Sequence, residues 1–141
     1  MKKKNVILTI KGVQQVEGEP PQEMELTTDG TLEVKTDRYV ITYTESELTG
    51  LEGTTTTFDV WQNKVVLSRT GAVNSQMVFV PGTVDQSLYD MGFGALLMEV
   101  RAHRIVVDMN ENGGHFDIDY TVHLEQTHAG RMRYHIEVKQ A

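Results

Sequence analysis

The sequence contains no cysteine, which excludes a disulfide framework, a thiolate nucleophile and a zinc site of the cysteine type. It has only three prolines and no low-complexity tract that would mark a linker. Its apolar runs are far shorter than the roughly 20 residues that a membrane-spanning helix requires. These absences predict a single domain over residues 1–141, in a soluble protein of a reducing compartment, for which the cytoplasm is the default.

Positive charge is also in short supply: 13 Lys and Arg residues stand against 20 Asp and Glu, for a formal net charge of -7. We therefore expect no nucleic-acid partner, because binding to the phosphate backbone depends on clustered basic residues. The one basic cluster, Lys2 to Lys4, precedes an apolar run that stops at Lys11 without a small-residue cleavage site. It is interpreted as the solubilising start of a first strand, and no membrane partner is expected.

Alternation of apolar and polar residues is what the sequence has in abundance. A period of two, rich in Thr, Val, Tyr and Ile, is typical of strands with one buried face. The alternating segments predict an all-β fold: an antiparallel meander barrel of about eight to ten strands, whose interior is either packed or holds one small ligand. The apolar sets are Val6, Leu8 and Ile10; Leu32 and Val34; Tyr39, Ile41 and Tyr43; Phe58 and Val60; Met77 and Phe79; and the even positions from Phe116 to Leu124.

Hairpin turns can be tested on the sequence, because residues opposite each other in a hairpin share a face and must agree in polarity. The turns that pass this test are two-residue turns at Asp37–Arg38, Gln62–Asn63 and Asn112–Gly113, and three-residue loops at Gly71–Val73 and His128–Gly130. The registers that they predict are Val34 opposite Ile41, Phe58 opposite Leu67, Val107 opposite Ile118, Leu67 opposite Met77, and Val122 opposite Ile136.

An apparent turn at Asp29–Gly30 fails the same test, because it would set Leu26 opposite Glu33. The even-numbered apolar positions from Met24 to Val34 continue through it without a change of phase. We therefore predict one long strand over these residues, bent or bulged at Gly30.

Residues 95–104 are the hardest segment to interpret, since most of them are good helix formers. The hairpin at Asn112–Gly113 instead requires a strand that runs back along this segment, and we predict a strand. Its apolar phase changes from even at Val100 to odd at Ile105. This change predicts a β-bulge between Arg101 and Arg104.

A family resemblance is carried by four short segments and one tyrosine. They are Tyr43–Gly50, Thr54–Thr57, Leu67–Gly71, Gln76–Phe79, and Tyr89 with Gly92 and Gly94 shortly after it. Together they resemble the YwiB-like family of small, uncharacterised bacterial proteins over most of the chain. The resemblance implies a calycin-type, lipocalin-like barrel and no particular activity. The segment from Tyr89 to Gly94 departs from the family's more usual Tyr-x-Thr-Pro-x-Gly.

The predicted registers place two opposite charges inside the barrel. Arg69 falls opposite Thr56 on an apolar face, and Glu45 shares the inward parity of Tyr43 at the same end of the barrel. We expect the two to meet in one mouth, because a buried arginine needs a carboxylate partner. Such a pair either plugs the barrel end and sets its register, or anchors the head group of a ligand. The candidate ligand-binding residues are Arg69, Glu45, Tyr43, Thr56 and Tyr89.

The five histidines raise the question of a metal or acid–base site. The predicted register sets His123 opposite His135 on the outer face, near Asp117 and Asp119. An exposed sheet surface seldom supplies the third, well-oriented ligand that a zinc site needs, so we interpret this as a solvated face and predict no metal site. His103 lies in the predicted bulge and becomes a candidate base only if it points inward.

No phosphate loop, dinucleotide fingerprint or metalloprotease motif is present, and no cofactor is expected. The leading hypothesis is a barrel that binds a small, partly apolar molecule, with an anionic head as one option, anchored by Arg69 and without catalytic activity. The second is a packed barrel that acts through its surface or as a homodimer. The third is an enzyme that uses Glu45, Tyr89 or an inward His103 as acid or base.

Overall fold

Strands make up most of the computed structural model, which describes residues 3–90, 92, 94–125 and 130–141. The elements are β1 (Lys3–Val16), β2 (Gln22–Val34), β3 (Tyr39–Thr44), the 3-10 turn η1 (Glu47–Thr49), β4 (Thr54–Val60), β5 (Val65–Gly71), β6 (Ser75–Phe79), β7 (Val84–Asp90), β8 (Ala95–Asn110), β9 (Gly113–Leu124) and β10 (Gly130–Gln140). Within these residues, no helix has the length and apolar character needed to cross a membrane.

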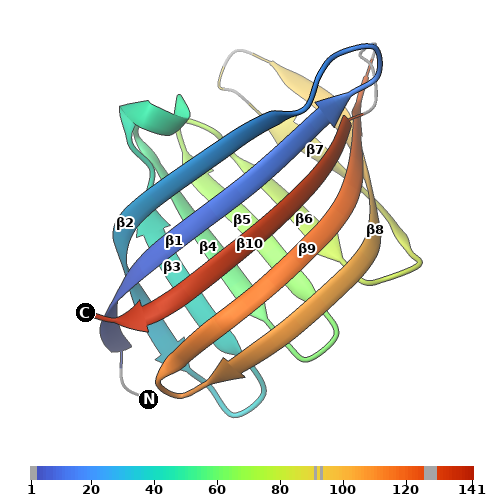
Figure 1. Ribbon diagram of the computed structural model, residues 1–141. Coiled ribbons are helices and arrows are strands. Elements are labelled where there is room, and N and C mark those ends of the chain that lie inside the picture. The colour runs from blue at the N-terminus through green and yellow to red at the C-terminus, as the bar shows by residue number, and fades with distance from the viewer. Residues whose placement is uncertain (1–2, 91, 93, 126–129) are drawn as a thin grey trace.

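The strands form one 10-stranded antiparallel sheet in the order β6-β5-β4-β3-β2-β1-β10-β9-β8-β7. The sheet curls so that β1, β10, β9 and β8 form one side and β3 to β6 the other, with the strands of the two sides crossing (Figure 1). The core lies between the sides, and its largest fully buried side chains include Phe79, Phe116, Leu8, Leu32, Ile41 and Leu67. The prediction of an all-β antiparallel barrel is confirmed.

The edge strands β6 and β7 nearly close the barrel along a seam. At this seam, mainly side-chain contacts replace the regular ladder of backbone hydrogen bonds. Three contacts cross it: a backbone bridge between Asn74 and Asp90, the Val78 N–H donating to Asp85 Oδ2 at 3.1 Å, and the Ser87 hydroxyl donating to the Gln76 carbonyl at 2.9 Å. Both sheet edges are therefore occupied, which protects them from pairing with another chain.

Two hairpins and the disputed strand follow the sequence prediction. Phe58 pairs with Leu67 across the turn at Gln62–Asn63, and Leu67 pairs with Met77 across the loop at residues 71–73. Residues 95–104 belong to β8, a strand despite their helix propensity. The register of β8 against β9 shifts between Ala102 and Arg104, where the bulge was predicted.

Two other hairpins differ from the prediction by two residues in register. The Lys35 N–H donates to the Arg38 carbonyl at 2.8 Å, so the first turn is Thr36–Asp37, not Asp37–Arg38, and Leu32 pairs with Ile41. Likewise Asn110 pairs with Gly113, so the second turn comprises residues 111 and 112. A shift of two residues keeps every side chain on its face, and the polarity test cannot detect it.

The register predicted for β9 and β10 is wrong by six residues. Val122 pairs with Gly130 and Ile136 with Phe116, whereas the sequence predicted Val122 opposite Ile136. The connection is longer than three residues, because β9 ends at Leu124 and β10 begins at Gly130. The predicted loop itself falls partly on residues 128 and 129, which lie outside the described residues.

β2 is one continuous strand through Gly30, as predicted, but without a bulge. Its register against β1 is unbroken, and Gly30 pairs with Val6. A Cβ added to Gly30 would lie 2.8 Å from both the Leu8 side chain and the Thr42 carbonyl oxygen. The glycine therefore permits a close approach of β3 where β2 passes from one side of the barrel to the other.

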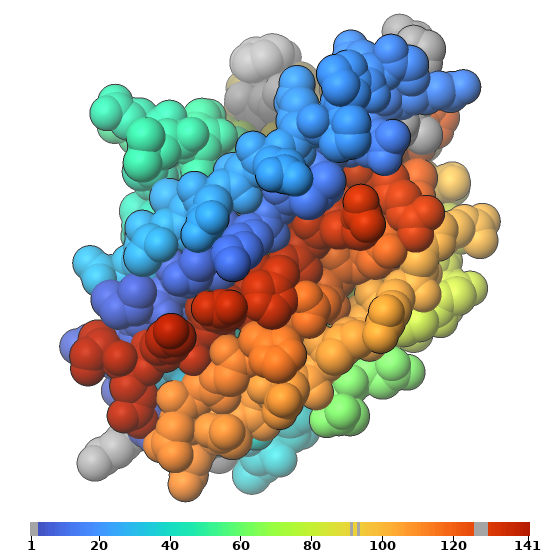
Figure 2. Space-filling model, viewed as in Figure 1, coloured from blue at the N-terminus to red at the C-terminus, as the bar shows by residue number. Residues whose placement is uncertain are grey.

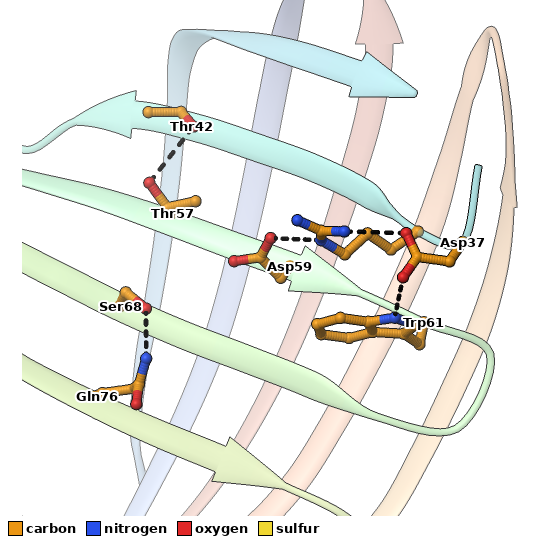
Figure 3. Close-up of polar contacts among 8 residues, drawn as sticks. Asp37, Thr42, Thr57, Asp59, Trp61, Ser68 and Gln76 are labelled. Carbon is orange, nitrogen blue, oxygen red and sulfur yellow. Dashed lines mark hydrogen bonds and ion pairs between the residues drawn. The ribbon is translucent and has the colours of Figure 1, made fainter. Parts of the chain in front are cut away.

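The end of the barrel at the start of β3 is braced on its outer surface. Arg38 donates from Nε to Asp59 Oδ1 at 3.0 Å and from Nη1 to Asp37 Oδ1 at 2.9 Å (Figure 3). Asp37 also accepts from Trp61 Nε1, whose ring is flanked by the Arg38 guanidinium and the Lys64 ammonium at 5.3 and 4.9 Å from its centroid. These contacts join two neighbouring hairpin turns. The candidate site lies at the opposite end of the barrel, after β3.

Candidate functional site at one mouth of the barrel

The structure places Glu45 and Arg69 together inside the end of the barrel that lies beyond β3. Glu45 directly follows β3, and its backbone N–H donates to the Thr54 carbonyl at 2.8 Å. Its side chain is 1% exposed, and that of Arg69, on β5, is 13% exposed. Arg69 Nε lies 3.9 Å from Glu45 Oε2, which is close enough for an ion pair and too long for a hydrogen bond.

Thr56 supplies a hydrogen bond to one oxygen of the Glu45 carboxylate and leaves the other oxygen without a partner. It pairs with Arg69 across β4 and β5, and its hydroxyl donates to Glu45 Oε2 at 2.5 Å. Glu45 Oε1 and Arg69 Nε are both buried and have no hydrogen-bond partner. Nearly all buried polar atoms in folded proteins are hydrogen-bonded, so this pair of orphaned atoms needs an explanation.

A cavity of about 90 Å³ lies beside these atoms. It has room for about three water molecules. Its lining residues are Ile10, Met24, Leu26, Tyr43, Glu45, Thr49, Leu51, Phe58, Leu67, Arg69 and Tyr134. Among them, Glu45 and Arg69 are the charged residues, and most of the rest are apolar. Thr49 and Leu51 come from the segment around η1, which projects beyond the barrel end in Figure 2.

Two tyrosines, Tyr43 on β3 and Tyr134 on β10, line the cavity. Tyr43 is 7% exposed, and its burial together with the nearby Glu45 carboxylate raises the pKa of its hydroxyl. Burial likewise raises the pKa of Tyr120, whose ring lies 6.2 Å from that of Tyr134. Both tyrosines with raised pKa therefore stay protonated at neutral pH. Tyr134 was not predicted as a site residue, although its even position on β10, in phase with the buried Ile136, indicated that it points inward.

Two of the five candidates do not line the cavity: Thr56, which nevertheless contacts Glu45, and Tyr89. Tyr89 has no such contact with the pair. It is half-buried on β7 and packs against the edge of the core, and it is not among the residues that line the cavity. Gly92, just after β7, has a positive φ of 92°, and its N–H donates to Asp90 Oδ1 at 2.8 Å, which is an ordinary turn. The neighbouring residues 91 and 93 lie outside the described residues.

The four histidines of the described residues lie on the outer face, but not in the predicted arrangement; His128 lies outside the described residues. The corrected register sets His123 opposite Glu99 and His135 opposite Asp117, so the two histidines do not face each other. The side chain of His103 is exposed and its Nε2 lies 2.6 Å from the Thr121 hydroxyl, so it is not an interior base. No group of three His, Asp or Glu residues in the described part of the chain could hold a metal ion.

An open groove of about 560 Å³ lies on the outer face of β1, β10, β9 and β8. Two of the carboxylates that line it already have partners. Arg131 forms two hydrogen bonds with Asp119 at 3.0 Å, and His135 Nδ1 lies 2.5 Å from Asp117 Oδ1. Because no buried group there lacks a partner, the smaller interior cavity is the better candidate site despite its size.

His135 makes the stability of this outer face depend on pH. Its hydrogen bond with Asp117, and to a lesser extent its 3.2 Å contact with Glu137, raise its pKa above the ordinary value of 6.5. The His135 contact in turn lowers the pKa of Glu137 below 4.5. Lys11, opposite His135 on β1, and His115, whose ring is 5.4 Å away, face the same imidazole.

We expect His135→Gln to destabilise the protein at pH 5.5 and to have much less effect at pH 9. A group with a raised pKa contributes its full stabilisation below its unfolded-state pKa and loses it as the pH rises through the folded-state pKa. Urea unfolding of both proteins at the two pH values measures this, and added salt should reduce the difference at pH 5.5. An effect that is equal at both pH values would contradict the role of the charged imidazole.

The fold and the mouth define a class of protein: a nearly closed antiparallel β-barrel with a small, mainly apolar cavity at one end, beside a buried pair of opposite charges. A family model described as a domain of unknown function, DUF1934, matches residues 8–136, and the chain belongs to this family. The "Uncharacterized beta-barrel protein YwiB" of Bacillus subtilis (strain 168) is 31% identical over 130 residues, which cover 90% of this chain and 89% of that protein. The crystal structure of the ywiB protein from Bacillus subtilis superposes with a TM-score of 0.82 at 27% identity, covering 96% of this chain and 92% of that one. The family resemblance seen in the sequence is confirmed.

Proposed function

We propose that this barrel binds a small, partly apolar molecule in the cavity beside Glu45 and Arg69, and that it does so without catalysing a reaction. The observation that carries the proposal is the pair of orphaned atoms, Glu45 Oε1 and Arg69 Nε, next to a cavity in the mouth of the barrel. Pockets of this composition, mainly apolar with a few convergent polar groups, are the usual form of small-molecule sites.

The spacing of the pair favours binding over a purely structural plug. A plug is most stable when the two charges touch, since charge-assisted hydrogen bonds have lengths of about 2.7–2.9 Å. Here Arg69 Nε lies 3.9 Å from Glu45 Oε2. Each buried polar atom left without a partner costs about 1–3 kcal/mol, which a bound molecule would recover by supplying that partner.

The lining sets limits on the molecule. Ile10, Leu26 and Leu67 provide an apolar surface for its body, while Arg69 and Glu45 receive its polar head. A volume of about 90 Å³ accommodates only a short body. A longer molecule would have to displace the segment that carries Thr49 and Leu51 and extend out of the mouth.

Native mass spectrometry of the protein purified from its own host tests the proposal. We expect a bound small molecule on the wild-type protein and its loss from Arg69→Gln. The matched control is Arg131→Gln, which removes a guanidinium from the exposed pair with Asp119 and should keep the molecule. A wild-type protein that carries no molecule and is dimeric would instead support a packed barrel that acts through its surface.

A further inference from the structure

We infer that the head group recognised in this cavity is uncharged and carries a hydrogen-bond donor beside an acceptor, as a primary amide does. This inference rests on the proposed binding function. It departs from the anionic head that the inward arginine alone would suggest, and it follows from the two buried polar atoms beside the cavity that lack a partner.

The hydrogen-bonding capacity of the two orphaned atoms is complementary. Glu45 Oε1 belongs to a carboxylate, which can only accept, and Arg69 Nε can only donate. The other carboxylate oxygen, Oε2, already accepts from the Thr56 hydroxyl. A head group that satisfies both free atoms must therefore donate to Glu45 and accept from Arg69. A carboxylate lacks the donor and an ammonium lacks the acceptor, whereas a primary amide has both, on two atoms bonded to the same carbon.

The charges of the cavity lining lead to the same class of ligand. Glu45 and Arg69 are the charged residues of the lining, and their charges cancel. Tyr43, whose raised pKa keeps its hydroxyl protonated, adds no negative charge. An anion or a cation placed here would lose its hydration without finding an uncompensated opposite charge, and a buried charge without such a partner is costly. A neutral polar head avoids this cost.

Three probes with the same four-carbon skeleton separate the possibilities: butyramide, butyrate and n-butylamine. They are titrated into the 15N-labelled full-length protein at pH 7, and the Nε–Hε resonance of Arg69 is followed by NMR. We expect butyramide to bind about tenfold more tightly than either charged probe, and to shift the Arg69 resonance, because each charged probe leaves one buried atom without a partner.

The outcomes distinguish the head-group inference from the binding proposal. Butyrate or n-butylamine binding more tightly than butyramide would overturn the inference and leave small-molecule binding in place. If none of the three probes shifts Arg69, the cavity holds only water and the binding proposal itself fails.

A substitution at Glu45 provides a second readout. Glu45→Gln keeps the shape of the side chain and removes its negative charge, so Arg69 is left as an uncompensated cation. We expect the preference to change from butyramide towards butyrate. Glu137→Gln, a carboxylate on the outer face, is the matched control and should keep the wild-type preference. An unchanged preference in Glu45→Gln would overturn the inference, and if this variant does not fold, the comparison of probes on the wild-type protein still decides it.

Discussion

Replacing Arg69 by methionine is expected to lower the free energy of unfolding by about 3 kcal/mol at pH 7. The Glu45 side chain is 1% exposed, and the substitution leaves its carboxylate buried without a positive charge nearby. Removing one partner of a buried pair costs more than the pair itself contributes, because the remaining charge has lost its hydration. Urea unfolding curves give the difference directly, provided that the slope with denaturant stays the same.

Two further variants test whether the unpaired Glu45 carboxylate causes the loss of stability in Arg69→Met. Arg69→Met/Glu45→Met removes both charges and should recover most of the loss, because apolar residues of similar volume replace a buried pair without a large penalty. Arg131→Met, on the exposed pair with Asp119, should cost much less, because solvent screens this pair. Equal losses for Arg69→Met and Arg131→Met would show that burial of the pair is not important for stability.

Gly114→Ala is expected to destabilise the protein by about 3 kcal/mol or more, or to prevent folding. Gly114 is the second residue of β9 and has a φ of 134°, which residues with a Cβ rarely adopt. An added Cβ would also overlap the backbone carbonyl oxygen of Asp108 on the paired strand β8, and backbone in the middle of a sheet cannot easily move away. The yield of folded protein and its urea midpoint measure the effect.

Gly18→Ala is the matched control for this prediction. Gly18 also has a positive φ, of 84°, but no atom lies within 4 Å of the position that a Cβ would take. Only the backbone strain remains, and the expected cost is about 1 kcal/mol. A comparable loss in both variants would mean that strain alone, and not the overlap with β8, accounts for the effect at Gly114.

The candidate site shows how much can be predicted from the alternation of inward-facing and outward-facing residues along each strand. The predicted opposition of Arg69 and Thr56 holds in the structure, and Glu45 is buried at the same end of the barrel. The 3.9 Å separation, the orphaned atoms and the cavity could not be predicted, because they depend on side-chain conformations set by several strands. Tyr134 reaches the cavity from β10, whose register the sequence predicted wrongly.

The sequence by itself determined which residues face inward and that the chain folds into consecutive antiparallel strands, including β8 with its bulge near Arg104. This information is local, because a period of two in polarity assigns each residue to a face whatever its partner. Only the tertiary structure decided which residues pair across the β2–β3, β8–β9 and β9–β10 connections, and that a polar cavity opens beside Glu45 and Arg69. Registers that differ by an even number of residues bury the same side chains. The choice among them is therefore made by turn geometry, by contacts such as those of Arg38, and by closure of the barrel, all of which involve residues far apart in the sequence.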